Sequence, residues 1–336
     1  MRAARLYAAR QVRVEEVPSP VPGPGEVLVR VRVVAICPSD CRLYAHGHAG
    51  GVKPDHPMIQ GHEFAGEVAA LGARVSGPPV GTRVAVEPSW HCGVCDLCRE
   101  GRTNICRNVV FPSFPQRDGA LAEYIACPAF SVHPLPENVS DVEGALVEPL
   151  GVAIHAVRLA ALQPGEAVVV LGAGVIGTSV VQLARLGRAG QVAVVEPVPG
   201  RREWPARLGA SPVVASHTDL LATRHEAHVV FECSGEDGTL DQAVHLARPG
   251  GRIVVVGITH SERGVFDMAA ARRRELTVIF SRRSRDTLAE AVRLVAERQV
   301  DLKGVSFRQF SLEETAAAME ATASRPGDML RAIVTP

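Results

Sequence analysis

Residues 167–177 read AVVVLGAGVIG, and this stretch decides how the second half of the chain folds. Its first five residues form a short apolar run, which predicts a buried strand. Three glycines follow in the pattern GxGxxG, and an apolar stretch compatible with a helix continues to Leu186. Glycines at this spacing permit a tight turn and let a pyrophosphate approach the free N–H groups of the helix N-terminus. The stretch therefore predicts a dinucleotide site with contacts at Gly172, Gly174, Val175, Ile176 and Gly177.

An acidic residue at the end of the next expected strand supports this prediction. Glu196 lies 22 residues beyond Gly174. A carboxylate at that place accepts hydrogen bonds from the adenosine ribose hydroxyls and repels a 2′-phosphate, so NAD is favoured over NADP. Arg201 and Arg202 follow closely and could pair with that phosphate, which keeps NADP open as the alternative.

Further short apolar runs surround this stretch and alternate with helix-compatible segments. They are residues 191–196, 228–232, 252–256 and 276–280. Short buried strands that alternate with helices predict a doubly wound parallel sheet with helices on both faces. We therefore expect an α/β dinucleotide-binding domain of the Rossmann type over residues 151–289.

The first 150 residues have a different character. Residues 27–36 read VLVRVRVVAI, an alternation of period two that predicts a half-buried strand. Proline- and glycine-rich turns such as residues 18–25 separate further short strands. We expect a β-rich domain here, and the total length of 336 residues is ample for two domains.

The composition limits the partners. Lys and Arg number 36, as do Asp and Glu, which argues against nucleic acid or an anionic membrane surface as a main partner. No secretory signal is visible at the N-terminus, and the most apolar window, residues 167–181, is short and interrupted by glycines. These features predict a soluble, cytoplasmic protein whose partner is a small molecule.

Four of the eight cysteines fall within fifteen residues, with the spacing C-x2-C-x2-C-x7-C. Clustered cysteines in a large cytosolic chain bind metal more often than they form disulfides. Four thiolates close the tetrahedral shell of zinc, so this site is structural and pins a lobe over about residues 88–110. A bacterial iron–sulfur run would end with x3 and a proline, whereas Arg107 follows the last cysteine here. The predicted ligands are Cys92, Cys95, Cys98 and Cys106.

A second set of residues has the chemistry of an open metal site. Thiolate, imidazole and carboxylate all bind zinc, and three such ligands plus a water make a catalytic shell. Each residue is a weak signal when taken alone. The candidates are Cys37, His62, Glu63 and Glu148.

The order of these motifs carries a resemblance. Cys-x-Ser-Asp at residues 37–40, Gly-His-Glu at 61–63, the four-cysteine lobe, Glu-Pro-Leu at 148–150 and the glycine turn follow one another. In this order and approximate spacing the chain resembles the zinc-dependent medium-chain alcohol dehydrogenase superfamily, and most of all its sorbitol (polyol) dehydrogenase branch. The resemblance implies a GroES-like catalytic domain over residues 1–150 and 290–336, with the Rossmann domain between. It also implies two zinc ions per chain, NAD, and a homo-oligomer, either dimer or tetramer.

By this resemblance Cys37, His62 and either Glu63 or Glu148 hold the catalytic zinc, and the other carboxylate binds the water of the metal. Neighbouring residues of an extended chain point to opposite sides, so His62 and Glu63 reach one metal only if the chain turns there. Asp40 is implied to orient the histidine ligand.

The resemblance also implies that Ser39 begins proton removal from the substrate, aided by Glu148. The sequence departs from the family at two nearby places. Pro38 stands where the family has glycine, and Arg42 stands where many relatives have histidine, so a histidine relay is absent and the substrate pocket is more cationic. Arg283 falls where related polyol enzymes place a substrate-side arginine.

The resulting functional hypothesis is a reversible, zinc-dependent hydride transfer between NAD and a secondary alcohol of the polyol or sugar type. Threonine or butanediol dehydrogenase on the same scaffold is an alternative, although Ser39 and Arg42 replace the Thr and His usual in threonine dehydrogenases. A third alternative is a catalytically silent dinucleotide-binding or structural protein. The presence of all four candidate ligands of the open site argues against it.

Overall fold

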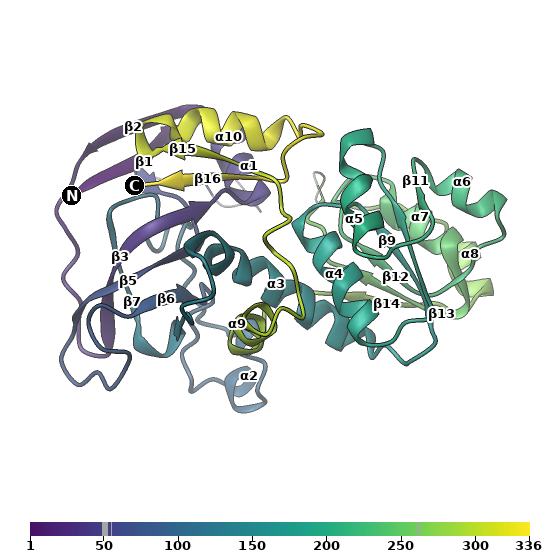
Figure 1. The fold of residues 1–336 in the computed structure, drawn as a ribbon, viewed down its shortest axis with the longest axis horizontal. Helices are drawn as coiled ribbons and strands as arrows, with labels where there is room; N and C mark the ends of the chain where they lie inside the picture. The colour runs from purple at the N-terminus through teal and green to yellow at the C-terminus, as the bar shows by residue number, and fades with distance from the viewer. Residues whose placement is uncertain (49–52, 55, 260, 262) are drawn as a thin grey trace. The chain divides into compact units, whose positions relative to one another are not determined.

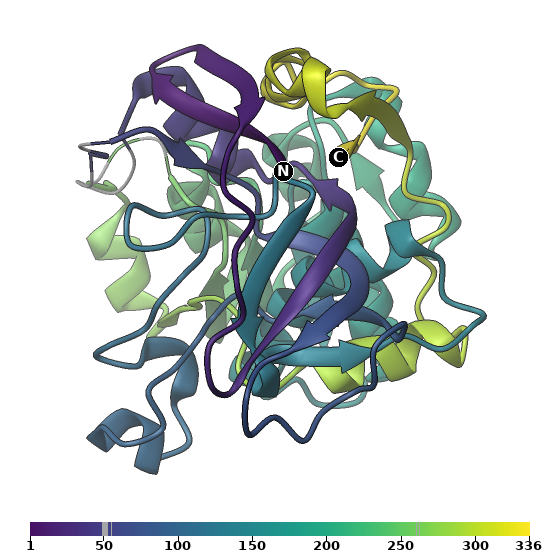
Figure 2. The same ribbon diagram turned by 90° about the vertical axis from the view of Figure 1, so that its left-hand side faces the viewer.

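The computed structural model describes residues 1–48, 53–54, 56–259, 261 and 263–336 (Figure 1). The chain divides into two units. The first unit comprises Met1–Pro149 and Ser284–Pro336, and the second comprises Leu150–Arg283. The expected boundaries were at residues 150 and 290, so the chain returns to the first unit a few residues earlier than expected. Both termini lie in this first unit (Figure 2).

The first unit is built on a sheet with strand order β15-β16-β3-β5-β6-β8, in which β7 also pairs with β3. A smaller sheet has the order β2-β1-β4. The strands of the larger sheet are β3 (Glu26–Ala35), β5 (Glu63–Leu71), β6 (Arg83–Val86), β7 (Tyr124–Pro128), β8 (Val132–Pro134), β15 (Phe307–Ser311) and β16 (Arg331–Thr335). Those of the smaller sheet are β1 (Arg2–Ala8), β2 (Gln11–Glu16) and β4 (Met58–Ile59).

The alternation in β3 explains its central place in the sheet. Val27, Val29 and Val31 are buried in the core of this unit, whereas Arg30 between them is exposed. The arginines of this strand thus lie on the polar face, as a period of two requires. Phe64 of the neighbouring β5 belongs to the same core.

Helices complete the first unit. Helix α1 (Pro38–His46) begins directly after Cys37, which has an extended backbone, and Pro38 occupies its first turn. Proline is tolerated there because the N–H groups of the first turn have no partner within the helix. The other helical segments are α2 (Asp96–Arg99), α3 (Asp141–Ala160), α9 (Leu288–Ala296), α10 (Thr315–Ala323), η1 (Thr103–Ile105), η2 (Ala129–Ser131) and η4 (Leu312–Glu314). Of these, α3 continues past Pro149 into the second unit.

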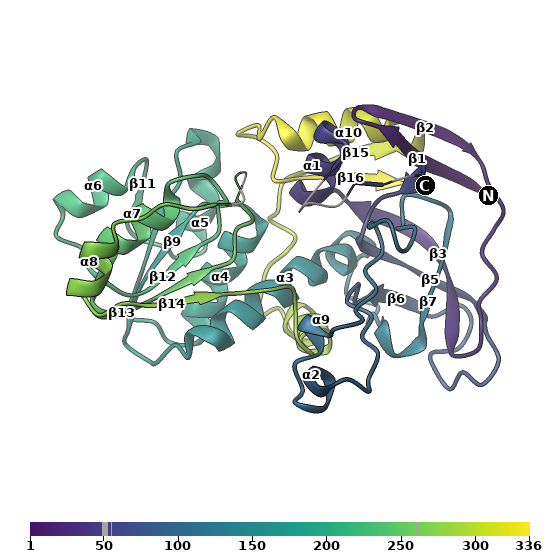
Figure 3. The same cartoon turned by 180° about the vertical axis from the view of Figure 1, so that it is seen from behind.

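The second unit is a parallel sheet between helices (Figure 3). Its strand order β11-β10-β9-β12-β13-β14 is the doubly wound order. From β9 the chain adds strands toward one edge of the sheet, and from β12 it adds them toward the other edge, while all strands stay parallel. This confirms the predicted α/β fold class. The strands are β9 (Ala167–Leu171), β10 (Gln191–Val195), β11 (Val213–Val214), β12 (Ala227–Glu232), β13 (Ala247–Val255) and β14 (Thr277–Phe280). The helices are α4 (Val175–Leu186), α5 (Glu203–Arg207), α6 (His217–Ala222), α7 (Thr239–Leu246), α8 (Met268–Arg273) and η3 (Pro199–Arg201).

Across the part of the chain that the structure describes, none of the helices has both the length and the apolar character needed to cross a bilayer.

Candidate functional site

The four clustered cysteines lie together at the lobe of the first unit. The Sγ atoms of Cys95 and Cys98 are 3.5 Å apart, those of Cys92 and Cys106 are also 3.5 Å apart, and 3.8 Å separates those of Cys95 and Cys106. Four sulfurs that bind one zinc at roughly 2.3 Å are about 3.8 Å from one another. The arrangement therefore fits a closed tetrahedral zinc site.

Backbone N–H groups stabilise the thiolates of Cys92 and Cys95, whereas desolvation and the neighbouring cysteines raise the pKa of Cys98 to about 12. Hydrogen bonds from the N–H groups of Val94 and Cys95 lower the pKa of Cys92 to about 6. The N–H groups of Cys92 and Asn108 both donate to the sulfur of Cys106 at 3.4 Å. Because zinc binds the thiolate rather than the thiol, the donors at Cys92 favour the form that the metal requires.

The open site forms where β3 ends and β5 begins. The two strands are antiparallel, and Ala35 pairs with Glu63. This register brings the residues just after β3 beside those just before β5, although they are distant in the sequence. Ligand atoms of Cys37, His62 and Glu63 consequently lie within 4.8 Å of one another.

The backbone turns at Gly61, directly before the two adjacent candidate ligands. Its φ is +94°, in the left-handed region, and a Cβ there would lie 2.9 Å from Val34 Cγ1. Only glycine fits both the conformation and the space. The chain thus turns immediately before His62, and the ligand atoms of His62 and Glu63 lie within 4.8 Å of each other.

Glu63 has one paired and one unpaired oxygen. Its Oε1 accepts a hydrogen bond of 3.0 Å from the guanidinium of Arg331 on β16, and both side chains are buried. Its Oε2 is buried and has no hydrogen-bond partner among the described residues. Such an atom is costly unless something else satisfies it, and a metal ion does so. Sequence reasoning missed Arg331, whose one signal is an isolated charge within a short apolar strand.

Glu148 lies on α3 and is outside the group of three ligand residues. It is buried, and burial together with the negative charge of Glu63 raises the pKa of its carboxyl to about 8. A carboxyl group with this pKa can take up or release a proton near neutral pH.

Asp40 lies beside the ring of His62. Its Oδ1 is 3.4 Å from His62 Nδ1, within ion-pair distance although not aligned as a hydrogen bond. Burial would raise the pKa of Asp40, but the charge of His62 and hydrogen bonds from Ser113 and Gly61 outweigh it, so this pKa is lowered. Asp40 therefore stays ionised and can hold the ring.

The other predicted residues of this region are placed as follows. The hydroxyl of Ser39 donates to Cys37 Sγ at 3.2 Å, so Ser39 lies beside the candidate ligands. Arg42 is half-buried on α1. Arg283 ends the second unit, and its role at the substrate stays a prediction.

The glycine turn of the second unit joins β9 to α4. Gly172 has a φ of +93°, and a Cβ on Gly177 would lie 1.9 Å from the carbonyl oxygen of Gly172. A Cβ on Gly174, which caps α4, would meet nothing within 4 Å. The first and last glycines are thus required by the turn itself, and the middle one leaves open space at the helix N-terminus, where an anion binds.

Glu196 follows β10 and is tied to this turn. Its Oε2 accepts a hydrogen bond of 2.7 Å from the N–H of Ala173, and its Oε1 accepts one of 2.8 Å from Val198. The guanidinium of Arg202 donates to the carbonyl oxygens of Glu196 and Pro197 at 2.6 Å. The guanidinium of Arg202 is therefore occupied by backbone carbonyl groups. Arg201, the other arginine considered for a 2′-phosphate, ends η3.

Comparison with known proteins gives two family matches. Residues 23–137 match the alcohol dehydrogenase GroES-like domain, and residues 175–297 match the zinc-binding dehydrogenase domain. The chain belongs to the zinc-binding dehydrogenase family. This dehydrogenase is 33% identical to sorbitol dehydrogenase of Bacillus subtilis (strain 168). The match covers 100% of the present chain and 97% of the relative.

Solved structures agree. A protein of Sinorhizobium meliloti 1021 assigned to the zinc-binding dehydrogenases, bound to NADP, superimposes with a TM-score of 0.89 at 31% identity, covering 100% of this chain and 99% of that one. Galactitol-1-phosphate dehydrogenase of Escherichia coli also has a TM-score of 0.89, at 27% identity and full coverage of both chains. These matches confirm the predicted family, its polyol branch, and the expectation of zinc and a nicotinamide dinucleotide as cofactors.

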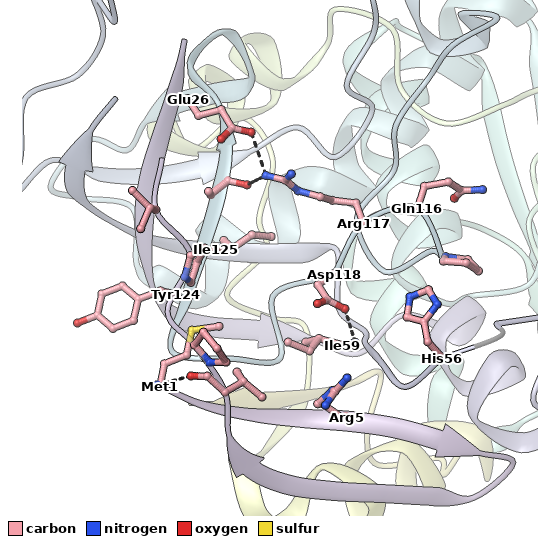
Figure 4. Close-up of a pocket in the computed structure, with 17 residues that line it drawn as sticks. Met1, Arg5, Glu26, His56, Ile59, Gln116, Arg117, Asp118, Tyr124 and Ile125 are labelled. Atoms are coloured by element: carbon pink, nitrogen blue, oxygen red, sulfur yellow. Dashed lines mark hydrogen bonds and ion pairs between the residues drawn. The ribbon is translucent and has the colours of Figure 1, made fainter. Parts of the chain in front are cut away.

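A separate cavity of about 610 Å³ lies elsewhere in the first unit of this dehydrogenase (Figure 4). The described residues that line it include none of the candidate zinc ligands. Three of its polar side chains are engaged with neighbours: Arg117 donates to Glu26 at 2.9 Å, and Asp118 accepts from the N–H of Ile59 at 2.8 Å. This cavity is therefore distinct from the open metal site.

Proposed function

We propose that this dehydrogenase interconverts a secondary alcohol of the polyol or sugar type and the corresponding ketone, with zinc held by Cys37, His62 and Glu63. The observation that carries the proposal is the meeting of a thiol, an imidazole and a carboxyl group within 4.8 Å, with one carboxyl oxygen left unpaired. The polyol class is supported by the likeness to sorbitol dehydrogenase and galactitol-1-phosphate dehydrogenase.

Of the two glutamates, Glu63 is the proposed ligand. It lies in the ligand group, and Arg331 fixes one of its oxygens, which leaves the other for the metal. Glu148 lies outside the group and has a raised pKa, so we assign it proton exchange rather than constant coordination. A permanent ligand must stay ionised, whereas a proton carrier must titrate near the working pH.

The protein residues divide the remaining work. When bound, zinc supplies a Lewis acid for the negative charge that develops on the substrate oxygen, and the dinucleotide supplies the hydride acceptor. Asp40 holds the ring of His62. Ser39 is proposed to relay the hydroxyl proton of the substrate: its Oγ accepts that proton as its own hydroxyl proton passes to the carboxylate of Glu148. Glu148 then exchanges that proton with the surroundings. Arg42 and Arg283 are proposed to face the polar substrate.

For the cofactor we propose NAD as the preferred dinucleotide, bound along the turn of residues 172–177. The proposed contact of Glu196 with the adenosine ribose is supported by its place after β10 and by its hydrogen bond to the glycine turn, and its negative charge disfavours a 2′-phosphate. NADP remains the alternative, since Arg201 is close in the sequence and a solved relative binds NADP.

We further propose a homo-oligomer, a dimer or tetramer, in the cytoplasm. β14 is an edge strand of its sheet and exposes Phe280, and the preceding segment exposes Met268 at the start of α8 and Val265 before it. An open edge with exposed apolar residues is a typical association surface. The cluster of zinc-binding thiols suits a reducing compartment.

Metal analysis of matched variants tests the proposal. The wild-type chain should hold two zinc ions, and Cys37→Ser should lose one of them together with all NAD-linked activity while the fold persists. Cys41→Ser is the control, because Cys41 lies on the helix that follows Cys37 but is buried, and its sulfur donates to the carbonyl oxygen of Met319. Full activity of Cys37→Ser would refute the catalytic assignment.

A substrate screen decides the substrate class. Reduction of NAD should be followed with polyols, sugar alcohols, butanediol and threonine, with and without a chelator. Turnover of polyols that the chelator abolishes is the expected result. Turnover of threonine or butanediol alone would instead support a threonine or butanediol dehydrogenase. Inactivity of the fully zinc-loaded protein on every alcohol would support a catalytically silent dinucleotide-binding protein.

A further inference from the structure

Ser113 is a buried residue with an unusual backbone. It is 3% exposed, and its φ of +74° lies in the left-handed region that side-chain-bearing residues rarely adopt. Such a conformation costs free energy and persists only where the surroundings hold it. Ser113 follows the four-cysteine lobe and belongs to neither set of candidate zinc ligands.

The hydroxyl of Ser113 contacts both groups that place His62. It donates to Asp40 Oδ1 at 2.5 Å and accepts from the N–H of Gly61 at 3.0 Å. Asp40 Oδ1 is the atom that lies 3.4 Å from His62 Nδ1, and Gly61 is the residue directly before His62. One hydroxyl thus fixes the backbone that precedes the histidine and the carboxylate beside its ring.

These contacts have a consequence for the ring of His62. A carboxylate held by the Ser113 hydroxyl cannot rotate away from the ring, and its negative charge, 3.4 Å from Nδ1, favours a proton on that nitrogen. The imidazole is then fixed as the tautomer whose Nε2 lone pair is free to bind a metal. Phe111 supports the same orientation, because its ring centroid lies 5.0 Å from that of His62.

The segment that carries Ser113 is anchored at the base of the lobe. Trp90 and Val110 exchange backbone hydrogen bonds of 3.0 and 2.9 Å across this base. Beyond it, the N–H of Ser113 donates to the carbonyl of Arg117, and the guanidinium of Arg117 lies 5.4 Å from the ring centroid of Trp90. The position of Ser113 therefore depends on the base of the four-cysteine lobe.

We propose that Ser113 is a positioning residue that, through Asp40, fixes the orientation and tautomer of His62 and so sets how tightly the open site holds zinc. The inference rests on the proposed catalytic zinc. It also gives the lobe a second purpose, because the segment that ends the lobe delivers the hydroxyl to the other metal site.

Two substitutions separate the hydroxyl from the backbone strain. Ser113→Ala removes the hydroxyl and keeps the strain, whereas Ser113→Gly removes the hydroxyl and adopts a positive φ without cost. Ser131→Ala is the matched control. Ser131 is also buried, in the same unit, and its hydroxyl donates to the carbonyl of Pro128 at 2.7 Å.

The measurement is competition for zinc between the full-length enzyme and a colorimetric chelator, together with the visible spectrum after Co²⁺ exchange. Removing a partner of a histidine ligand typically lowers metal affinity about 10- to 100-fold. We expect at least a tenfold loss at the open site for both Ser113 variants, with a shifted cobalt spectrum. The four-cysteine site and Ser131→Ala should retain wild-type affinity.

Wild-type zinc affinity of the open site in Ser113→Gly would overturn the inference. A loss of affinity in Ser113→Ala alone would then be due to backbone strain rather than to the missing hydroxyl. An equal loss in Ser131→Ala would also overturn it, as general destabilisation. Should Ser113→Ala fail to fold, Ser113→Gly alone decides the question. Cys37→Ser in the same assay separates the two proposals: retention of both zinc ions by that variant would refute the catalytic site itself rather than the role of Ser113.

Discussion

The buried ion pair between Arg331 and Glu63 allows a quantitative test of the open metal site. The two charged atoms are 3.0 Å apart, and the side chains are 6% and 2% exposed. Removing one partner of such a pair leaves an uncompensated buried charge, which costs about 3–5 kcal/mol. Arg331→Met should therefore lower the free energy of unfolding by about this amount, equivalent to a fall in Tm on the order of 10 °C.

Zinc should reduce this cost, because a divalent cation on the free oxygen of Glu63 replaces the lost positive charge. We expect the full loss in chelator-treated protein and a clearly smaller one in zinc-loaded protein, measured by denaturant unfolding of both forms. Glu63→Gln in the Arg331→Met background should recover much of the stability, since no buried carboxylate is then left unpaired.

A matched control distinguishes burial from the mere loss of an arginine. Arg308 lies on the neighbouring strand β15 and pairs with Asp328 at 2.5 Å, but the two side chains are 52% and 69% exposed. Arg308→Met should cost less than about 1 kcal/mol. The reasoning would be refuted if Arg331→Met cost no more than this control, or if its cost were the same with and without zinc.

Three further predictions follow from other sites. The pKa of Glu148 is raised to about 8, so between pH 4.5 and 8 the folded, chelator-treated protein keeps a proton that the unfolded chain loses, and its stability should fall as the pH rises through this range. Glu148→Gln should remove this dependence when unfolding is measured at a series of pH values. An unchanged slope would contradict the assignment. Cys95→Ser should lower the zinc content from two to one and lower the Tm, because a closed zinc site contributes folding energy; two retained zinc ions would exclude Cys95 as a ligand. Glu196→Ala should reduce the NAD-to-NADP ratio of kcat/KM about tenfold, the equivalent of one hydrogen bond to a charged group, and an unaltered ratio would remove that role.

Features that depend on neighbouring residues could be predicted from the sequence. The glycine turn and its strand and helix are local, and the backbone at Gly172 and Gly177 has the geometry that the pattern requires. The four cysteines lie within one lobe, so their spacing alone predicts that they meet. In both cases the chain between the residues is too short to place them far apart.

The open site could be predicted only in part, because its members meet through strand pairing. Residue chemistry and the family resemblance suggested Cys37 and His62, but the alternation rule for extended chains left the choice between Glu63 and Glu148 open. Our proposal of Glu63 rests on tertiary geometry: the pairing of β3 with β5 brings Glu63 beside Cys37, and Val34 and Leu121 pack against Gly61 directly before His62.

Two side chains at this site gave almost no sequence signal. Arg331 is 268 residues from Glu63, and Ser113 is 73 residues from Asp40. Neither belongs to a motif with a known mechanism, and a single arginine in a strand or a single serine in a loop is ordinarily exposed. Their roles arise from tertiary contacts that no local pattern encodes.

The charges of the open site explain why these two residues matter. Burial raises the pKa values of Cys37 and Glu148, and the negative charge of Glu63 raises both further. Two positive groups stand against these acids. Burial would lower the pKa of Arg331 and of His62, but the charges of Glu63 and Cys37 raise the former and those of Asp40 and Cys37 raise the latter. The folded protein thus gathers more acidic groups than it can keep ionised alone, and a divalent cation supplies the charge that is lacking. The same imbalance that costs stability in the fold is what makes the site select a metal.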